Sequence, residues 1–423
     1  MLNKTTNVFE SLESNVRSYC RYFPDVFIKA KDSMIYTESG KIFLDFLAGA
    51  GALNYGHNND FIKRKLLDYI KEDGLTHGLD LYTGAKEEFL QTFDQLILKP
   101  KGLNYKVQFC GPTGTNAVEA SFKIARKVKK RPGIFSFMGG YHGMSMGSLA
   151  ATANHYHREG AGKELSGVTF MPHPSTFSFD TIDYMEKLLT DSHSGVDKPS
   201  AIIFETIQAE GGVNVASIEW MRRLYNLCRR HDILLICDDI QVGCGRTGDF
   251  FSFERAGIIP DIIVLSKSIS GYGLPMSIVL LKPELDIWKP AEHNGTFRGN
   301  QLAFICATAA LQFGEKERLA EEVERKGGFV ENFLLTQIKP LSNKIDIRGL
   351  GLIWGVDVSR VRKDAASLAN HITQRCYELG LLVERVGRND TVIKLMPPLT
   401  ISMDELEKGC LILKQAFEES LRT

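Results

Sequence analysis

The sequence predicts an α/β protein built on an open, mainly parallel sheet that carries helices on both faces. Short apolar runs rich in β-branched residues alternate with helical patterns through the middle of the chain. Most of these runs lack a strict alternation of apolar and polar residues, which is typical of strands covered on both faces. Repeated strand–helix units favour parallel strands, because the helix returns the chain to the same edge of the sheet. The expected strands cover residues 106–109, 134–137, 168–171, 201–204, 233–237, 262–265 and 277–281.

The two ends of the chain differ from this middle part and predict a second, smaller α+β unit. Near the N-terminus, strands are expected on either side of a turn at Gly40. Near the C-terminus, Ser402 and Glu405 form a capping box that predicts the start of a final helix. The expected elements are helices at 116–129 and 218–231 in the middle part, strands at 33–37 and 41–46, helices near 316–337 and 365–379, and strands within 346–358 and at 381–384 and 391–395.

Length indicates more than one domain, because 423 residues are too many for one small core. We expect residues 1–75 and 316–423 to form a small domain together, and residues 76–315 to form a large one. Residues 160–199 are the most loop-like stretch, since they are rich in Ser, Asp, Pro and His.

Composition and charge exclude several classes of function. The 51 basic residues balance 51 acidic ones, so the total charge gives no reason to expect nucleic acid or an anionic membrane as a partner. The polar N-terminus lacks a secretory segment, and the apolar runs are too short to span a bilayer. Eight scattered cysteines without a C-x-x-C pair are typical of reduced core thiols in a cytoplasmic protein. No metal is expected, because His155 and His157 lack a third nearby ligand.

Two residues at the ends of successive expected strands carry the strongest chemical signal. Asp238 follows the apolar run 233–237, at a position where open α/β sheets bind ligands. Lys267 follows the strand at 262–265 among small residues, where a lysine can be desolvated and act as a nucleophile. Taken alone, each would more often be a strand-end aspartate or a solvated lysine. Together they match a pyridoxal-type cofactor, which needs a lysine for a Schiff base and a carboxylate beside its ring nitrogen.

Two further segments complete a cofactor site of this kind. The stretch from Gly111 to Asn116 lies between an expected strand and helix, where helix amides and a hydroxyl can bind phosphate. Tyr141, beside His142 in a glycine-rich segment, offers an aromatic face that can stack on a planar ring. Separately, the first would be an ordinary turn and helix cap, and the second a core aromatic residue.

These residues together resemble the class III aminotransferases, a fold-type I family of pyridoxal-phosphate enzymes. The resemblance runs from the segment 45–51 to the segment 396–400, and its most specific parts are DDIQVGCGRTG at 238–248 and Ser266-Lys267. It implies pyridoxal 5'-phosphate as cofactor, and active sites at the interface of a homodimer or a larger homo-oligomer. It implies that Lys267 forms the Schiff base and that Asp238 pairs with the ring nitrogen. Around the ring, it implies that Gln241 contacts the hydroxyl, and that Ile240 and Tyr141, with His142 beside it, pack on the ring. At the phosphate, it implies contacts from Gly114 and Thr115, and one from Thr296 of the partner subunit.

A narrower resemblance, over residues 10–20, 49–58 and 270–277, is to the diaminobutyrate–2-oxoglutarate subgroup that enters ectoine synthesis. Its members interconvert L-aspartate 4-semialdehyde and L-glutamate with L-2,4-diaminobutyrate and 2-oxoglutarate. The same reaction also feeds some siderophores and other metabolites derived from diaminobutyrate.

The chain departs from the usual family pattern at two positions. Asp239 stands where the family usually has glutamate, and Lys394 stands where ornithine-type members bind the substrate α-carboxylate with an arginine. Lysine is a point charge without the bidentate fork of arginine. Glu210 matches the gating glutamate of those members, and we expect Lys394, Glu210 and Tyr55 to bind substrate.

The expected reaction is a transamination between a small-molecule amino donor and a keto or aldehyde acceptor. Lys267 acts twice, first by leaving the cofactor and then by moving a proton at the substrate carbon. Two half-reactions through one site give ping-pong kinetics. Three alternatives stay open: another ω-amino acid transaminase (ornithine, 4-aminobutyrate or lysine type), an aminomutase or racemase on the same scaffold, and a catalytically silent binding protein.

Overall fold

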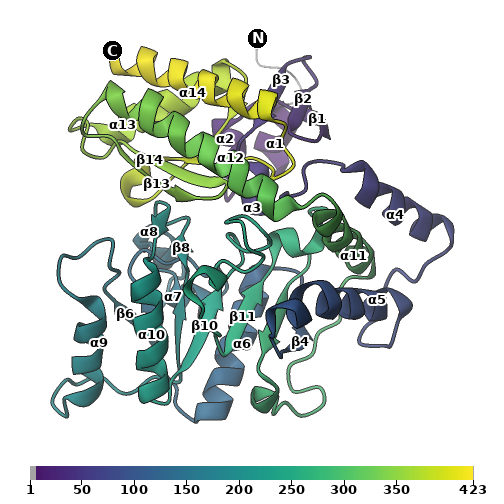
Figure 1. The fold of residues 1–423 in the computed structure, drawn as a ribbon, viewed down its shortest axis with the longest axis vertical. Helices are drawn as coiled ribbons and strands as arrows, with labels where there is room; N and C mark the ends of the chain where they lie inside the picture. Colours follow the sequence, from purple (N-terminus) through teal and green to yellow (C-terminus); the bar gives the residue numbers. More distant parts are fainter. Residues whose placement is uncertain (1–5, 423) are drawn as a thin grey trace.

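The computed structural model describes residues 6–422, which form two bodies stacked one above the other (Figure 1). The first and last of these described residues lie in the upper body, and the middle of the chain forms the lower one. The first five residues, part of the polar start noted in the sequence, and Thr423 lie outside the described range.

A seven-stranded sheet forms the centre of the lower body. Its order is β4-β12-β11-β10-β7-β5-β6, and β12 alone runs opposite to its neighbours. This confirms the mainly parallel sheet. The strands are β4 (Lys106–Phe109), β5 (Ile134–Phe137), β6 (Val168–Met171), β7 (Ala201–Phe204), β10 (Leu234–Asp238), β11 (Ile262–Leu265) and β12 (Ile278–Leu281).

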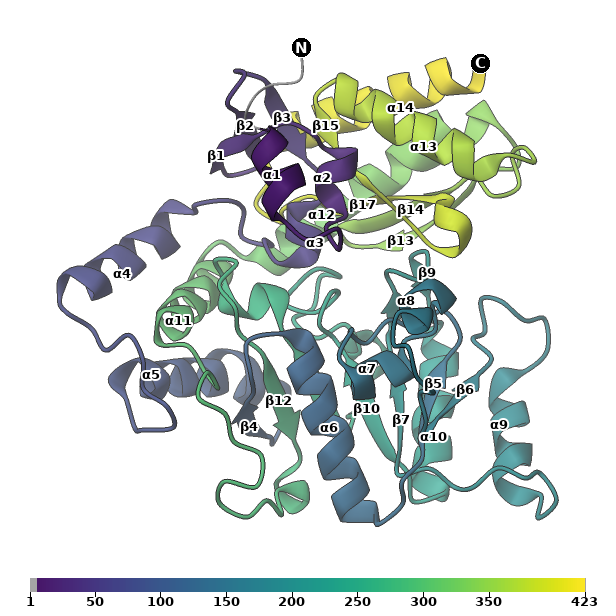
Figure 2. The ribbon, with the colours of Figure 1, turned by 180° about the vertical axis from the view of Figure 1, so that it is seen from behind.

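Alternate side chains of the central strands are buried on opposite faces of this sheet. In β10, Leu235 belongs to the apolar cluster that includes α10 (Ile218–Arg230), and Ile236 belongs to the cluster that includes α6 (Gly114–Lys129). Figures 1 and 2 show α10 and α6 on opposite faces. Each fully buried leucine or isoleucine contributes about 1.5–3 kcal/mol. Burial on both faces explains why these runs show no alternation.

The N-terminal and C-terminal parts of the chain share a sheet in the upper body. Its order is β1-β2-β3-β15, and β15 (Leu381–Leu382) pairs in parallel with β3 (Ile42–Asp45). A second, antiparallel sheet has the order β13-β14-β17-β16. The division of the chain into 1–75, 76–315 and 316–423 stays a prediction. The other strands are β1 (Phe27–Lys31), β2 (Met34–Thr37), β8 (Ile207–Gln208), β9 (Asn214–Val215), β13 (Asp346–Leu350), β14 (Ile353–Asp357), β16 (Glu384–Val386) and β17 (Val392–Leu395).

Two local expectations were wrong. The single strand expected at 381–384 is divided, because β15 pairs with β3 in one sheet while β16 pairs with β17 in the other. The loop-like stretch 160–199 contains the helix α9 (Thr181–Thr190). Asp180 caps this helix by accepting hydrogen bonds from the backbone N–H groups of Ile182 and Asp183, at 3.0 Å each.

The helices expected at 116–129, 218–231, 316–337, 365–379 and after Ser402 are all present, and several others were not expected. The capping box predicted at Ser402 precedes α14, with the Glu405 N–H donating to the Ser402 hydroxyl at 3.3 Å. The unexpected α11 is apolar on most of its faces, so it lacks the one-sided pattern of a surface helix. The bounds of these two helices and of those not yet given are α1 (Thr6–Leu12), α2 (Tyr19–Tyr22), α3 (Ala48–Gly51), α4 (Asp60–Lys71), α5 (Gly84–Phe93), α7 (Met146–Ala151), α8 (His155–Glu159), α11 (Gln301–Lys316), α12 (Leu319–Phe333), α13 (Ala365–Glu378) and α14 (Met403–Arg422).

Three features of the described residues concern membrane spans, metal sites and cysteines. Among residues 6–422, no helix has the length and apolar character that a membrane span requires. Over the same range, no group of three or more His, Cys, Asp and Glu side chains could hold a metal ion. All eight cysteines are free thiols, and seven are buried. Cys20 is exposed, which corrects its assignment to the core, because the short helix α2 that carries it has no buried residues.

Candidate active site

The carboxyl ends of the sheet strands bring the predicted site residues together. Asp238 ends β10, and Lys267 follows β11, its parallel neighbour in the sheet. The loop after β4 reaches the same edge, because a Cβ atom added to Gly114 would lie 2.9 Å from Cδ1 of Ile240 and 3.5 Å from Cβ of Ser266. Three loops that are far apart in the sequence therefore meet at one place.

Lys267 is the first residue of a short 3-10 turn, Lys267–Ser270, and has a left-handed backbone with a φ of 51°. Its Nζ donates a hydrogen bond of 2.8 Å to the carbonyl oxygen of Ala50. Burial lowers the pKa of Lys267 below its ordinary value. Glu210 opposes this shift, and the positive charge of Lys394 adds to it. A lysine with a lowered pKa is a better nucleophile and base near neutral pH.

The Ala50 carbonyl belongs to a left-handed turn in which all four residues of α3 have positive φ values, of 48°, 59°, 53° and 89°. The side-chain amide of Gln241 donates to the same oxygen at 2.8 Å. The hydroxyl of Ser268, next to Lys267, donates to the carbonyl of Gly51 at 2.7 Å. This turn is therefore a point where the upper and lower bodies are joined.

A buried carboxylate holds this turn in place. Asp45 Oδ1 accepts hydrogen bonds of 2.8 Å from the backbone N–H groups of Leu47 and Ala48. Its Oδ2 lies 2.7 Å from Nε2 of His57. A left-handed conformation costs a residue with a side chain about 1–2 kcal/mol, so these contacts offset strain. Sequence reasoning gave Asp45 and His57 no role, because no local signal predicts the turn.

Asp238 is buried and lies in hydrogen-bond contact with His142. Its Oδ2 is 2.7 Å from Nδ1 of His142, and its Oδ1 accepts from the backbone N–H of Ile240 at 3.2 Å. Burial alone would lower the pKa of His142, but the hydrogen bond to Asp238 and its charge outweigh burial and raise it. The histidine therefore fixes the orientation of the Asp238 carboxylate.

Tyr141 is anchored through its backbone to a second buried acid. The N–H of Tyr141 donates to Glu205 Oε1 at 2.9 Å. Burial raises the pKa of Glu205 to about 8, so this carboxyl group is mostly protonated at neutral pH. Burial also raises the pKa of Tyr141, and the charges of Glu210 and Asp238 act in the same direction. Glu205 had no role in the sequence analysis.

The predicted phosphate cup lies at the N-terminus of α6. Thr115 Oγ1 is 2.6 Å from the hydroxyl of Ser145 and also contacts the hydroxyl of Ser148. A Cβ atom added to Gly143 would lie 2.6 Å from Thr115 Oγ1, so only glycine leaves this space open. Glu119 accepts hydrogen bonds from Ser145 and from the backbone N–H of Gly147, at 2.6 and 2.8 Å. The two serines and Glu119 are additions to the predicted set.

Lys394 on β17 is fully buried between two carboxylates. Its Nζ lies 2.7 Å from Glu210 Oε1 and 3.1 Å from Glu384 Oε1. Burial alone would lower the pKa of Lys394, but the two acids outweigh burial and raise it. Lys394 and Glu210, which were both expected to bind substrate, are in direct contact, and Glu384 is a partner that the sequence did not reveal. The available signal was an acidic residue directly after the apolar run 381–383.

Two other residues of the specific run 238–248 support the backbone. Asp239 turns away from Asp238 and accepts hydrogen bonds from the N–H and the hydroxyl of Ser252. Arg246 is completely buried, and it donates to Asn54 Oδ1 at 2.5 Å and to the carbonyl of Leu352 at 3.0 Å. Burial lowers the pKa of Arg246 to about 9.

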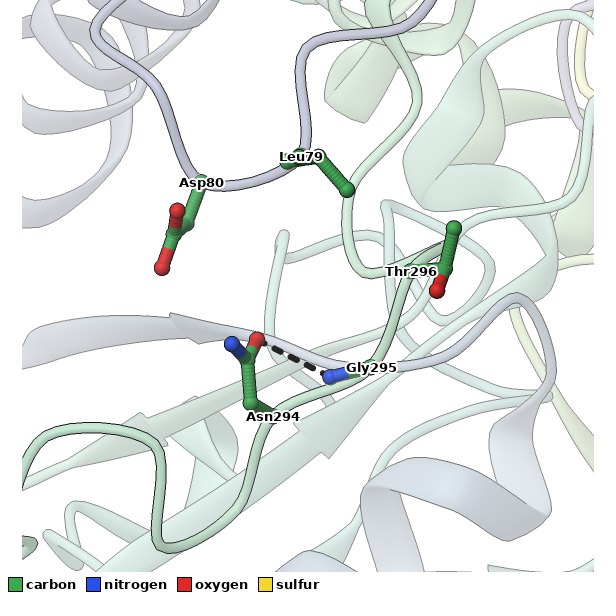
Figure 3. A pocket seen from close by; sticks show the side chains of 5 residues that line it. All are labelled: Leu79, Asp80, Asn294, Gly295 and Thr296. Atoms are coloured by element: carbon green, nitrogen blue, oxygen red, sulfur yellow. Dashed lines mark hydrogen bonds between the residues drawn. The ribbon is translucent and has the colours of Figure 1, made fainter.

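Two predicted residues lie apart from the group around Lys267. Tyr55 is buried in the apolar cluster of the upper body, where its ring meets Phe313 edge to face at 6.4 Å. Thr296 is exposed and lines a surface pocket of about 340 Å³ (Figure 3). The other residues that line this pocket are Leu79, Asp80, Asn294 and Gly295.

The residues present fit the cofactor expected from the sequence. A phosphate needs hydroxyls and helix N-terminal amides, which the cup around Thr115 supplies. A pyridine nitrogen needs a charged carboxylate, which His142 keeps in place at Asp238. An aldehyde needs an amine with a lowered pKa, which Lys267 supplies.

Comparison with known proteins adds independent findings. The family described as Aminotransferase class-III matches residues 20–417. The chain is 53% identical over 419 residues to the diaminobutyrate–2-oxoglutarate transaminase of Streptomyces avermitilis, with 98% of each chain covered. It is 50% identical over 420 residues to the transaminase of the same name from Halalkalibacterium halodurans, with 99% of this chain and 97% of the relative covered.

Solved structures share the fold over nearly the whole chain. The ornithine aminotransferase of Toxoplasma gondii, which shows partial occupancy of PLP at its active site, gives a TM-score of 0.85 at 27% identity. The match covers 99% of this chain and 95% of the other. A transaminase from the marine bacterium Virgibacillus gives a TM-score of 0.88 at 20% identity, with 99% of each chain covered.

Proposed function

The chain belongs to the class III aminotransferase family, and on this premise we propose that it is a pyridoxal-phosphate transaminase for diaminobutyrate. It interconverts L-aspartate 4-semialdehyde and L-glutamate with L-2,4-diaminobutyrate and 2-oxoglutarate by a ping-pong mechanism. The observation that carries this proposal is that Lys267 and Asp238 meet at one sheet edge, with Lys394 and Glu210 nearby. Relatives at about half identity that carry the name of this reaction support the choice of substrates.

The chain supplies a separate contact for each part of the cofactor. Thr115 and the N-terminus of α6 would hold the phosphate, and Asp238 would hold the ring nitrogen. Ile240 and Tyr141 would lie against the ring, and Gln241 would contact the ring hydroxyl. Pyridoxal phosphate, when bound, supplies a ring that accepts the electron pair left when the substrate carbon loses its proton.

Lys267 would have two tasks in the reaction. Its Nζ would hold the cofactor in the resting enzyme and would become a free amine beside the reacting carbon once the amino donor takes its place. As a free amine it would take the proton from the substrate carbon and deliver it to the cofactor carbon bonded to the same nitrogen, and it would carry the proton the other way in the second half-reaction. The hydrogen bond to the Ala50 carbonyl orients the amine without giving it a compensating negative charge. Lys267 therefore gives up its own proton more readily than a lysine paired with a carboxylate.

The substrate end of the site must serve two different substrates. Glutamate reacts at a carbon that bears a carboxylate, whereas diaminobutyrate reacts at a terminal CH₂. We propose that Glu210 releases Lys394 for the carboxylate of glutamate and pairs with it again for diaminobutyrate. Glu210 is better placed to move than Glu384, since 30% of its side chain is exposed against 9% for Glu384.

We also propose a cytoplasmic homodimer that supplies diaminobutyrate for ectoine or related metabolites. The support for a shared site is that Thr296 is exposed and lies beside Leu79 and Asp80 at a surface pocket, as suits a residue that acts across a subunit boundary. A catalytically silent protein is disfavoured, because Lys267 and Asp238 are both intact. Another ω-amino acid transaminase and an aminomutase remain as alternatives.

A panel of amino donors tests the substrate assignment. Diaminobutyrate, ornithine, 4-aminobutyrate and lysine are each supplied with 2-oxoglutarate, and products are identified by mass spectrometry. The expected result is the highest kcat/KM for diaminobutyrate, with glutamate as the second product. A higher value for another donor would favour the other ω-amino acid transaminases. A product formed from the donor alone, without 2-oxoglutarate, would favour an aminomutase.

The pair Asp238→Asn and Asp239→Asn tests the role of the ring-nitrogen carboxylate. Asp238→Asn should fold normally but react roughly tenfold to a hundredfold more slowly, because a charge-assisted hydrogen bond is worth about 1.5–3 kcal/mol. Asp239→Asn should mainly lower the melting temperature, because within residues 6–422 the Asp239 side chain is hydrogen-bonded only to the N–H and the hydroxyl of Ser252. The assignment of Asp238 is wrong if its variant keeps the wild-type rate.

Lys394→Met tests the binding of the glutamate carboxylate. Single-turnover measurements should show the glutamate half-reaction slowed roughly tenfold or more and the diaminobutyrate half-reaction slowed less, because only glutamate carries a carboxylate on its reacting carbon. Lys326→Met is the control, since Lys326 is also a buried lysine but bonds to the carbonyl of Leu399. Equal slowing of both half-reactions by Lys394→Met would contradict the proposal.

A further inference from the structure

Lys394 has one carboxylate partner that is fixed and one that lies on a loop. Glu384 on β16 is the residue directly opposite Lys394 in the antiparallel pairing with β17. It is nine-tenths buried. Glu210 instead lies in the segment between β8 and β9, with 30% of its side chain exposed. The two acids therefore hold the same ammonium group with different freedom to move.

The ammonium group of Lys394 can bind both carboxylates at once, and it can exchange Glu210 for a substrate carboxylate. It carries three N–H donors, of which one faces Glu384 and another faces Glu210. Glu210 and a substrate carboxylate carry the same charge, so replacing one by the other leaves the net charge around Lys394 unchanged. During the exchange, however, Lys394 has no counter-charge other than Glu384.

Without Glu384, the ammonium group of Lys394 would be buried and unpaired after Glu210 leaves and before the substrate carboxylate binds. A buried ammonium group without a partner is strongly destabilised and tends to lose its proton. The charged and titratable groups around Lys394 are Lys267 from the turn after β11, Glu210, Glu384 and Tyr19 of α2. Of these, Lys267 works against the charge on Lys394, and Tyr19 is neutral at physiological pH because its pKa is raised further beside Glu384 and Glu210.

Glu384 also depends on Lys394 for its own compensation. Only its Oε1 contacts Lys394, and its buried Oε2 has no hydrogen-bond partner among the described residues. No other Lys or Arg of the described chain forms an ion pair with Glu384. Glu384 and Lys394 therefore form a unit within one sheet, to which Glu210 is added from outside.

From this arrangement we propose that Glu384 is a positioning residue that keeps Lys394 charged and in place while Glu210 and the substrate carboxylate exchange. This rests on the proposed function and extends it. It makes Glu384 a determinant of the glutamate half-reaction and of its reverse with 2-oxoglutarate. The diaminobutyrate half-reaction does not need Glu384 in this way, since Glu210 stays on Lys394 throughout.

Glu384→Gln in the holoenzyme is the first test, because it keeps the shape of the side chain and removes its charge. Single-turnover rates with glutamate should fall roughly tenfold or more, as expected for the loss of a charge-assisted contact. Rates with diaminobutyrate should change less than the glutamate rates. Glu384→Asp keeps the charge and should recover part of the loss. Glu331→Gln on the exposed face of α12 is the matched control.

The pH profile separates positioning from a general structural effect. Removing a nearby anion lowers the pKa of a lysine, so the glutamate half-reaction of Glu384→Gln should decline at a lower alkaline pH than that of the wild type. Calorimetric binding of glutarate, a dicarboxylate without an amine or ketone, should be weakened in the same pH range. The diaminobutyrate profile should stay in place.

A double variant decides whether Glu384 acts through Lys394. Glu384→Gln should add little to the slowing already caused by Lys394→Met, because the group that it positions is gone. Equal slowing of both half-reactions, no slowing of either, or full additivity in the double variant would overturn the proposal for Glu384. If the wild-type enzyme fails to convert diaminobutyrate at all, the proposed function fails instead, and glutarate binding to the single variants still tests Glu384.

Discussion

One buried lysine, Lys394, and one partly buried lysine, Lys267, lie beside the same site, and the carboxylates around them decide which one keeps its proton. Lys394 contacts Glu210 and Glu384, and these acids raise its pKa despite burial. Lys267 donates to the neutral carbonyl of Ala50, and burial lowers its pKa. Because a carbonyl dipole compensates a positive charge far less than a carboxylate does, Lys267 gives up its proton more readily than Lys394. The assignment of one lysine to chemistry and the other to binding depends on this difference.

The difference in pKa between Lys267 and Lys394 depends on how the upper and lower bodies meet. The carbonyl of Ala50 reaches Lys267 only because the turn that contains it is left-handed, and this turn is held by Asp45. Arg246 and Asn54 fix the neighbouring backbone through buried hydrogen bonds. A hydrogen bond to a charged group of this kind is worth about 1.5–3 kcal/mol. Parts of the upper body without any chemical role of their own therefore keep the amine of Lys267 where it can react.

The sequence predicted those features that a short segment encodes by itself. The central strands are continuous apolar runs, and Asp238 and Lys267 are visible because each follows one of them. Features that depend on distant segments were not visible in this way. Glu384 gains its role only because β16 pairs beside Lys394, after the chain has changed sheets at residue 383. Tyr55 looked available for substrate because nothing in its own segment shows that its ring is covered by Phe313 of α11. That helix was itself missed, since its apolar residues surround it on most sides.

The proposed mechanism depends most directly on which lysine carries the cofactor. Reduction of the holoenzyme with borohydride, followed by proteolysis and mass spectrometry, would fix the cofactor to the residue that binds it and locate that residue in the sequence. The expected result is a single modified peptide that contains Ser266-Lys267, with Lys394 unmodified because its ammonium group stays protonated between two carboxylates. Attachment of the cofactor to Lys394, or to any lysine other than Lys267, would contradict the account.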